Sequence, residues 1–243
     1  MTNPANWGNE LRLTDCSFDF EQAATSHGRA SVGEYQGLAA AGGSFLTFFV
    51  QQHGTDPASI FFRRINAPAL ATVASVVIND GSAQRSMVTS LTVTFSTVVT
   101  LDPGAFELVR QEGGAIQFDV SEAVVDGHSV DTLTFTGPGI IGGSLADGHY
   151  ALTIHGNLVH DEFGQGLDGA GTGVAGSDRV DTFFRLFGDA DGDGHVDLGD
   201  VLHFAGTLGK HAGDPGYLWY FDYDGDGRVD GSDLVQLLRR FGR

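Results

Sequence analysis

The C-terminal part of the chain holds two copies of one twelve-residue pattern: DADGDGHVDLGD at residues 189–200 and DYDGDGRVDGSD at residues 222–233. Both copies read D-x-D-x-D-G-x-V-D-x-x-D. This spacing places carboxylates and one backbone carbonyl in the ligand order of a calcium-binding loop, and the glycine at position 6 provides the sharp turn that such a loop needs. The duplicated pattern therefore predicts two sites for Ca²⁺.

Each predicted site takes five aspartates and one backbone carbonyl. In the first loop the ligands are Asp189, Asp191, Asp193, the carbonyl of His195, Asp197 acting through water, and Asp200 as the bidentate ligand. In the second loop they are Asp222, Asp224, Asp226, the carbonyl of Arg228, Asp230 and Asp233. Aspartate replaces the usual glutamate at position 12, and its shorter side chain is expected to draw the following helix closer.

An alternative interpretation treats the two stretches as acidic surface turns without a metal. Neighbouring carboxylates about 4 Å apart repel each other by roughly 4 kcal/mol per pair near a protein surface. Five such groups in one loop would be costly without a cation. Charge repulsion therefore favours the calcium interpretation.

The same apolar pattern follows each loop. Val201, Leu202, Phe204, Ala205 and Leu208 align with Leu234, Val235, Leu237, Leu238 and Phe241. A glycine ends each run, so we expect one exiting helix per loop, and no helical pattern precedes either loop. Two loop–helix units without entering helices resemble a dockerin module, and the resemblance covers residues 188–243. The valines at position 8, Val196 and Val229, are expected to pair the loops back to back.

This resemblance implies a protein partner, because cellulosomal dockerins bind cohesins. Dockerins of that type repeat a Ser/Thr pair at loop positions 10 and 11, where this chain has Leu198 and Gly199 in one copy and Gly231 and Ser232 in the other. The copies thus depart from a twofold cohesin site. A cohesin-like or other surface protein is the expected partner.

Residues 67–187 alternate between apolar and polar side chains in short segments such as SLTVTF and HYALTI, with turn sequences every 8–15 residues. Evenly spaced short strands without a helical period predict a β-sandwich. Stretches such as SLTVTFSTVVTLDPGAFEL resemble bacterial Ig-like domains, which implies a structural spacer. The predicted fold class is therefore mainly β with a small α C-terminal module: an Ig-like β-sandwich followed by a dockerin-like pair of EF-hand loop–helix units.

Residues 1–66 resemble the last blade of a sialidase-type (BNR or Asp-box) β-propeller. The matching residues are Trp7 and Gly8, residues 12–15 (RLTD), residues 33–38 (GEYQGL) and residues 61–64 (FFRR). One blade cannot close a propeller, and no sialidase catalytic set can be assembled from this chain. We therefore expect no enzymatic activity from the chain alone, although a parent glycoside hydrolase is possible.

Composition narrows the choice of partner and compartment. A net charge of −18 argues against nucleic acid and anionic membranes as partners. The polar start MTNPANWGNE carries no signal peptide, and no apolar run approaches membrane-spanning length. Because loops of this kind suit the calcium concentration outside cells, we expect an extracellular or cell-surface location, with the leader removed or carried by a longer parent.

Three functions remain open at this point. The favoured one is a non-catalytic extracellular calcium-binding tail that docks or anchors a secreted or surface glycan-active protein. The second is a structural or adhesive subunit of a calcium-rigidified fibre, with self-association through N-terminal strands in residues 44–64. The third is a fragment of a sialidase-like glycosidase. Asp161, Asp168 and Asp178, around the glycine-rich residues 164–176, are candidates for a third cation site, but an ordinary loop is the preferred interpretation.

Overall fold

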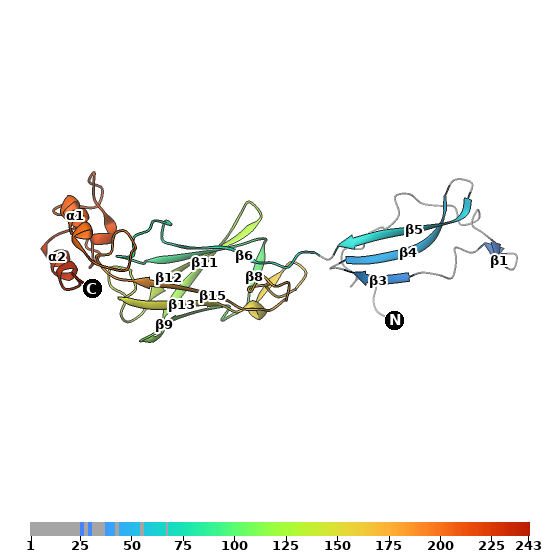
Figure 1. The fold of residues 1–243 in the computed structure, drawn as a ribbon, viewed down its shortest axis with the longest axis horizontal. Coiled ribbons are helices and arrows are strands. Elements are labelled where there is room, and N and C mark those ends of the chain that lie inside the picture. Colours follow the sequence, from blue (N-terminus) through green and yellow to red (C-terminus); the bar gives the residue numbers. More distant parts are fainter. Residues whose placement is uncertain (1–24, 27–28, 31–36, 42–43, 54–55, 67) are drawn as a thin grey trace. The chain divides into compact units, whose positions relative to one another are not determined.

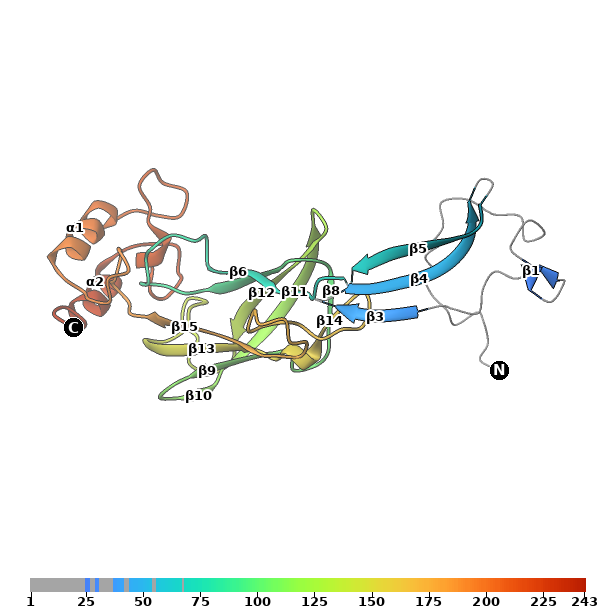
Figure 2. The same ribbon diagram turned by 45° about the vertical axis from the view of Figure 1, so that its right-hand side comes forward.

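Strands dominate the described residues, and the two α-helices found among them lie near the C-terminus (Figures 1 and 2). The computed structural model describes residues 25–26, 29–30, 37–41, 44–53, 56–66 and 68–243. Contacts divide the chain into two compact units, Met1–Ala69 and Leu70–Arg243. The predicted fold class, mainly β with a small α-module, is confirmed.

The first unit contains a three-stranded antiparallel sheet in the order β3-β4-β5. Its strands are β3 (Gly37–Ala41), β4 (Ser44–His53) and β5 (Asp56–Asn66), and a short hairpin pairs β1 (Thr25–Ser26) with β2 (Arg29–Ala30). The FFRR motif lies in β5. Trp7, Gly8 and residues 12–15 lie outside the described residues, as do most of residues 33–38.

The second unit begins with two four-stranded antiparallel sheets, in the orders β10-β9-β13-β15 and β11-β12-β7-β6, and a two-stranded sheet β14-β8. The chain crosses from one large sheet to the other between β10 and β11. The strands are β6 (Val73–Ile78), β7 (Ser90–Phe95), β8 (Val99–Leu101), β9 (Phe106–Arg110), β10 (Gly114–Ala115), β11 (Gln117–Val125), β12 (His128–Thr136), β13 (Gly148–Ile154), β14 (Val159–Asp161) and β15 (Arg179–Arg185).

Alternation along the strands builds the core of this sandwich. In β7 the residues at every second position, Leu91, Val93 and Phe95, are fully buried, as expected for a strand with one face on the core. Seventeen buried residues form the cluster, including Leu152 and Tyr150 of β13 in the opposite sheet. The sandwich thus has its own apolar core, independent of any metal.

The calcium-type loops follow β15 without a linker. Helix α1 (Leu198–Thr207) leaves the first loop, the 3₁₀ turn η4 (Trp219–Phe221) precedes the second, and helix α2 (Gly231–Leu238) leaves it. A second 3₁₀ turn, η3 (Gly156–Leu158), precedes β14. Both α-helices lie together at one end of the sandwich (Figures 1 and 2).

The loop–helix module shares its core with the end of the sandwich. Phe187, the last apolar residue after β15, is fully buried in a cluster with Phe204 of α1, Phe221 of η4 and Leu237 of α2, and this cluster also includes Met87 from the sandwich. Its ring meets Tyr223 edge to face, with centroids 4.9 Å apart. Because adjacent strand residues point to opposite faces, the sequence predicts that at least one of Phe183, Phe184 and Phe187 packs on the module; Phe187, which lies just after β15, does so.

Candidate metal centre

Three carboxylates converge in each loop. Their oxygen atoms lie within 4.8 Å of one another in two groups, Asp189, Asp191 and Asp193 in the first loop and Asp222, Asp224 and Asp226 in the second. Among the residues that the structure describes, no other group of three acids or histidines comes this close together. The sequence placed these same six residues at ligand positions 1, 3 and 5.

The acids at positions 1 and 12 form the buried wall of each site. Asp189 and Asp200 are buried in the first loop, as are Asp222 and Asp233 in the second. Positions 3, 5 and 9 are exposed in both loops, and so are His195 and Arg228 at position 7. Each site is therefore open to solvent on one side, which leaves a route for an ion.

Burial raises the pKa of one carboxylate in each loop. Loss of solvent raises the pKa of Asp189, and the charges of Asp200 and Asp191 raise it further, against hydrogen bonds from two backbone N–H groups. The pKa of Asp233 is also raised, by burial first and then by Asp224 and Asp222. A divalent cation between these oxygens would remove the repulsion and stabilise the ionised forms.

Position 12 ties the end of each loop to its beginning. Both oxygens of Asp200 accept backbone N–H groups, from Ala190 at 2.8 Å and from Asp197 at 2.8 Å. In the second loop Asp233 accepts from Tyr223 and Asp230, each at 2.8 Å. The loops thus have matching internal hydrogen bonds.

Position 9 also starts the helix. Asp197 is the N-cap of α1 and accepts from Gly199 N at 2.7 Å, while Asp200 at N3 accepts the backbone N–H of Asp197, which completes a capping box. Asp230 and Asp233 repeat the box at the start of α2. Sequence reasoning treated these residues only as ligands, although the D-x-x-D spacing before an apolar run is the signal for such a box.

The donor set fits a hard, oxygen-preferring cation. Carboxylate oxygens and backbone carbonyls are the ligands that Ca²⁺ prefers, and neither cluster includes a thiol or imidazole ligand. The clusters supply three aspartates each. Asp197, Asp200, Asp230, Asp233 and the carbonyls of His195 and Arg228 stay predicted ligands.

The expectation that Val196 and Val229, at position 8, pair the two loops is wrong, because their backbone groups form hydrogen bonds with other segments. Val196 N donates to Arg243 O at 3.2 Å, and Gly242 N donates to Val196 O at 2.9 Å. Val229 bonds in the same way to Gly209 and Lys210, which follow α1. Each loop is therefore held by the segment after the other loop's helix, because the helices reverse the chain and bring those segments alongside, while both valine side chains are buried in the shared core.

The loops differ in the hydrogen bonds at position 1, where, among the described residues, Asp222 has a side-chain partner that Asp189 lacks. The hydroxyl of Tyr217 donates to Asp222 Oδ2 at 2.7 Å, and the pKa of Tyr217 is raised, first by burial and then by this hydrogen bond. Tyr217 lies outside the repeated twelve-residue pattern, so the ligand spacing gave no signal for this contact. A hydroxyl that donates to a metal-ligating carboxylate in this way fixes the orientation of the carboxylate.

The candidate third site is not assembled in this way. Asp168 is tied to its own loop by Thr172 N at 2.9 Å and Gly173 N at 2.7 Å. Asp178 instead accepts from Gly156 N at 2.9 Å, and its other oxygen lies 3.2 Å from the His155 ring. Asp161 accepts from the backbone of residues 163 and 165. Each acid therefore forms hydrogen bonds with a different part of the backbone, as the interpretation of an ordinary loop predicts.

Apolar side chains line the outer surface of both helices. Leu198 and Leu202 of α1 are 64% and 66% exposed, and Val235 and Leu238 of α2 are 47% and 55% exposed. Leu208 and Phe241, just beyond the helix ends, are also exposed. The apolar stripe predicted from the sequence is thus divided: Phe204 and Leu237 are buried, Val201 and Leu234 pack partly buried against the same core, and the other members are exposed.

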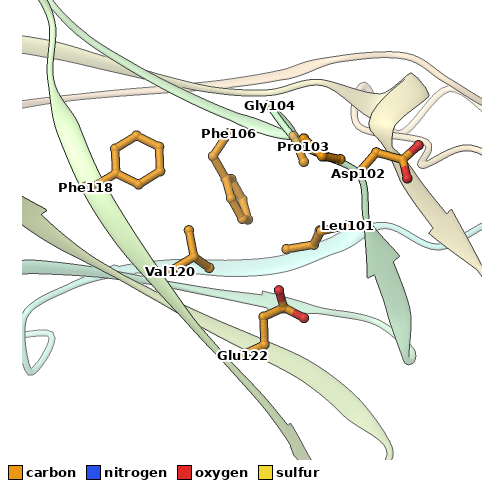
Figure 3. A pocket seen from close by; sticks show the side chains of 9 residues that line it. Leu101, Asp102, Pro103, Gly104, Phe106, Phe118, Val120 and Glu122 are labelled. Atoms are coloured by element: carbon orange, nitrogen blue, oxygen red, sulfur yellow. The ribbon is translucent and has the colours of Figure 1, made fainter.

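A separate groove lies on the sandwich (Figure 3). It has a volume of about 310 Å³ and lies between the segment from Leu101 to Phe106 and strand β11, with Phe118, Val120 and Glu122 on the strand side. Asp102 at its rim is 3.1 Å from His160 Nε2. The groove includes none of the predicted calcium ligands.

Comparison with known proteins supports the C-terminal interpretation. The family model of the dockerin type I domain matches residues 187–242, which span both loops and both helices. No curated protein and no solved structure matches the chain. The predicted dockerin resemblance is therefore confirmed for these residues. The resemblances of residues 67–187 to an Ig-like domain and of residues 1–66 to a propeller blade stay predictions.

Proposed function

We propose that residues 187–242 form a calcium-loaded docking module that attaches this chain to a cohesin-like domain. The family match gives the class of module, and the clustered carboxylates provide its calcium chemistry. We further propose two ions per chain, one in each loop, because the two loops repeat the same ligand spacing and the same internal hydrogen bonds.

The exposed apolar face of the helices carries the docking part of this proposal. Leu198, Leu202, Val235 and Leu238 would lose solvent contact in a complex, and contiguous exposed apolar residues beside polar loops are typical of protein interaction sites. The calcium loops hold the N-terminal end of each helix, so metal binding and the shape of this face are linked.

The remaining parts of the proposal follow from the module's role. The chain itself is non-catalytic and acts outside the cell or at its surface, as part of a secreted or surface protein that acts on glycans. No helix among the described residues is long and apolar enough to cross a membrane. In this proposal the docking module provides the attachment.

A binding experiment with a purified type I cohesin domain tests this function. We expect binding in millimolar calcium and loss of binding in EDTA. Leu202→Asp and Val235→Asp, combined in one chain, should abolish it, while Val124→Asp on the sandwich, at a residue that is 63% exposed, should have no effect. Binding that survives either EDTA or the double substitution would overturn the proposal.

A further inference from the structure

The two calcium loops touch the sandwich at equivalent positions. Gly192 and Gly225 are both at loop position 4, where the first meets the backbone of Ala83 and the second meets Gly142. A Cβ on Gly142 would lie 2.7 Å from the carbonyl oxygen of Tyr223 and 3.0 Å from the nitrogen of Gly225. Only glycine leaves room for the second loop to rest directly on this sandwich turn.

A single sandwich carboxylate holds the other end of the second loop–helix unit. Asp147 accepts from Arg240 Nε at 2.5 Å, from Arg185 Nη1 at 2.5 Å and from Phe187 N at 2.9 Å. Burial would raise the pKa of Asp147, but these partners outweigh it and lower the pKa. Asp147 therefore stays ionised and fixes Arg240, which follows α2.

Aromatic rings connect this ion pair to the loop. The guanidinium groups of Arg185 and Arg240 lie 5.7 and 5.3 Å from the ring centre of Tyr223, within the range of cation–π attraction. Tyr223 is at loop position 2, and its backbone N–H donates to Asp233 Oδ1 at 2.8 Å. The contacts thus run from the sandwich to the last ligand position of the second site.

We propose that Gly142 and Asp147 of the sandwich are positioning residues for the second calcium site. Gly142 supports the start of the loop at residues 223–225, and Asp147 anchors the end of the unit through Arg240. Ligands at both ends of the loop, Asp222 and Asp233, are then held near the separation that an ion requires. Holding ligands in place before binding reduces the ordering cost of binding and so increases affinity.

This inference rests on the proposed calcium binding. Variants that keep only one calcium site allow the inference and the proposed function to be tested separately. In full-length chains, Asp191→Ala leaves only the second site and Asp224→Ala leaves only the first, so calorimetry can measure each affinity alone. Gly142→Ala is compared with Gly143→Ala, because both glycines have positive φ (57° and 76°) but a Cβ at Gly143 meets nothing within 4 Å.

Gly142→Ala should weaken calcium binding at the second site by about tenfold, as loss of outer-shell support does in other metal sites. The same variant should change the calcium affinity of the first site by less than about twofold, and Gly143→Ala should change the affinity of either site by no more than that. Equal effects of the two alanines, or equal loss at both sites, would overturn the positioning role. Absence of any calcium binding in both single-site chains would overturn the proposed function itself.

Arg240→Gln provides a second test that does not crowd the backbone. It removes the charged partner on the module side and leaves Asp147 paired with Arg185. Arg239→Gln is its control, since Arg239 is the exposed neighbour at the end of α2. We expect weaker calcium binding at the second site for Arg240→Gln and unchanged binding for Arg239→Gln; no difference between the two variants would count against the role of Asp147.

Discussion

The sandwich and the loop–helix module are stabilised by different means. The sandwich buries seventeen apolar residues between two sheets, whereas the module's cluster has seven, one of which, Met87, comes from the sandwich. The module also carries ten aspartates in its two loops. An apolar core is enough for the first region, but the second gathers like charges around a small core and therefore needs a cation and a neighbour.

The first prediction is that chelation separates the two regions. EDTA should remove much of the helical circular-dichroism signal of residues 187–242, because repulsion among the loop carboxylates is no longer balanced, and metal-binding energy is folding energy in such modules. The β signal of the sandwich should remain. A chain that keeps its full helical signal at nanomolar free calcium would contradict this difference between the regions.

A second prediction concerns single ligands. Asp191→Ala and Asp224→Ala should each remove one bound calcium ion, because each cluster loses one of its three convergent carboxylates. Equilibrium dialysis gives the number of ions per chain. Asp119→Ala, on the exposed part of the sandwich, is the control and should retain both ions; loss of both ions on either loop substitution would show that the sites are not separate.

The third prediction is a pH effect within the sandwich. Asp131 on β12 is 1% exposed, and burial, with a smaller effect of Glu122, raises its pKa to about 6. The folded state thus binds this proton more tightly than the unfolded state, so the free energy of unfolding falls as pH rises from about 4 through 6.

Asp131→Asn gives a side chain of nearly the same shape that carries no charge. It should increase the free energy of unfolding at pH 7.5 by about 2 kcal/mol, and the gain should shrink towards pH 4.5. Urea denaturation in saturating calcium at both pH values measures this. Asp119→Asn, at an exposed position of β11, should change stability by less than about 0.5 kcal/mol. A gain independent of pH would contradict the raised pKa.

The smallest expected effect is a change in calcium affinity at the second loop alone. Tyr217→Phe removes the hydroxyl that donates to Asp222 and should weaken only the second calcium site, by up to about tenfold. Tyr220→Phe, in the adjacent turn, is the matched control. Titration in the Asp191→Ala chain measures the second site directly, and an unchanged affinity would show that the hydroxyl does not orient the carboxylate.

Local pattern predicted the elements of both regions. Alternation and turn residues predicted the strands that include β7 and β13, and an apolar stripe ended by glycine predicted α1 and α2. Strand β14 was missed because its three residues, VHD, show no alternation. Strand β11 runs to Val125, although residues 121–125 (SEAVV) show no regular alternation, since its pairing with β12 continues along the whole hairpin.

The contacts between the regions could not be predicted in this way. Asp147 and Arg240 are 93 positions apart, and neither lies in a motif. The Gly142 contact depends on two glycines that meet through space. Ligand spacing is a local property of the sequence, whereas the support behind the ligands comes from tertiary packing.

Calcium titration of the unmodified chain by calorimetry tests the central claim most directly. Two loops with the same ligand spacing and matching internal hydrogen bonds should bind two Ca²⁺ ions per chain at millimolar concentration. A stoichiometry below two would contradict the account.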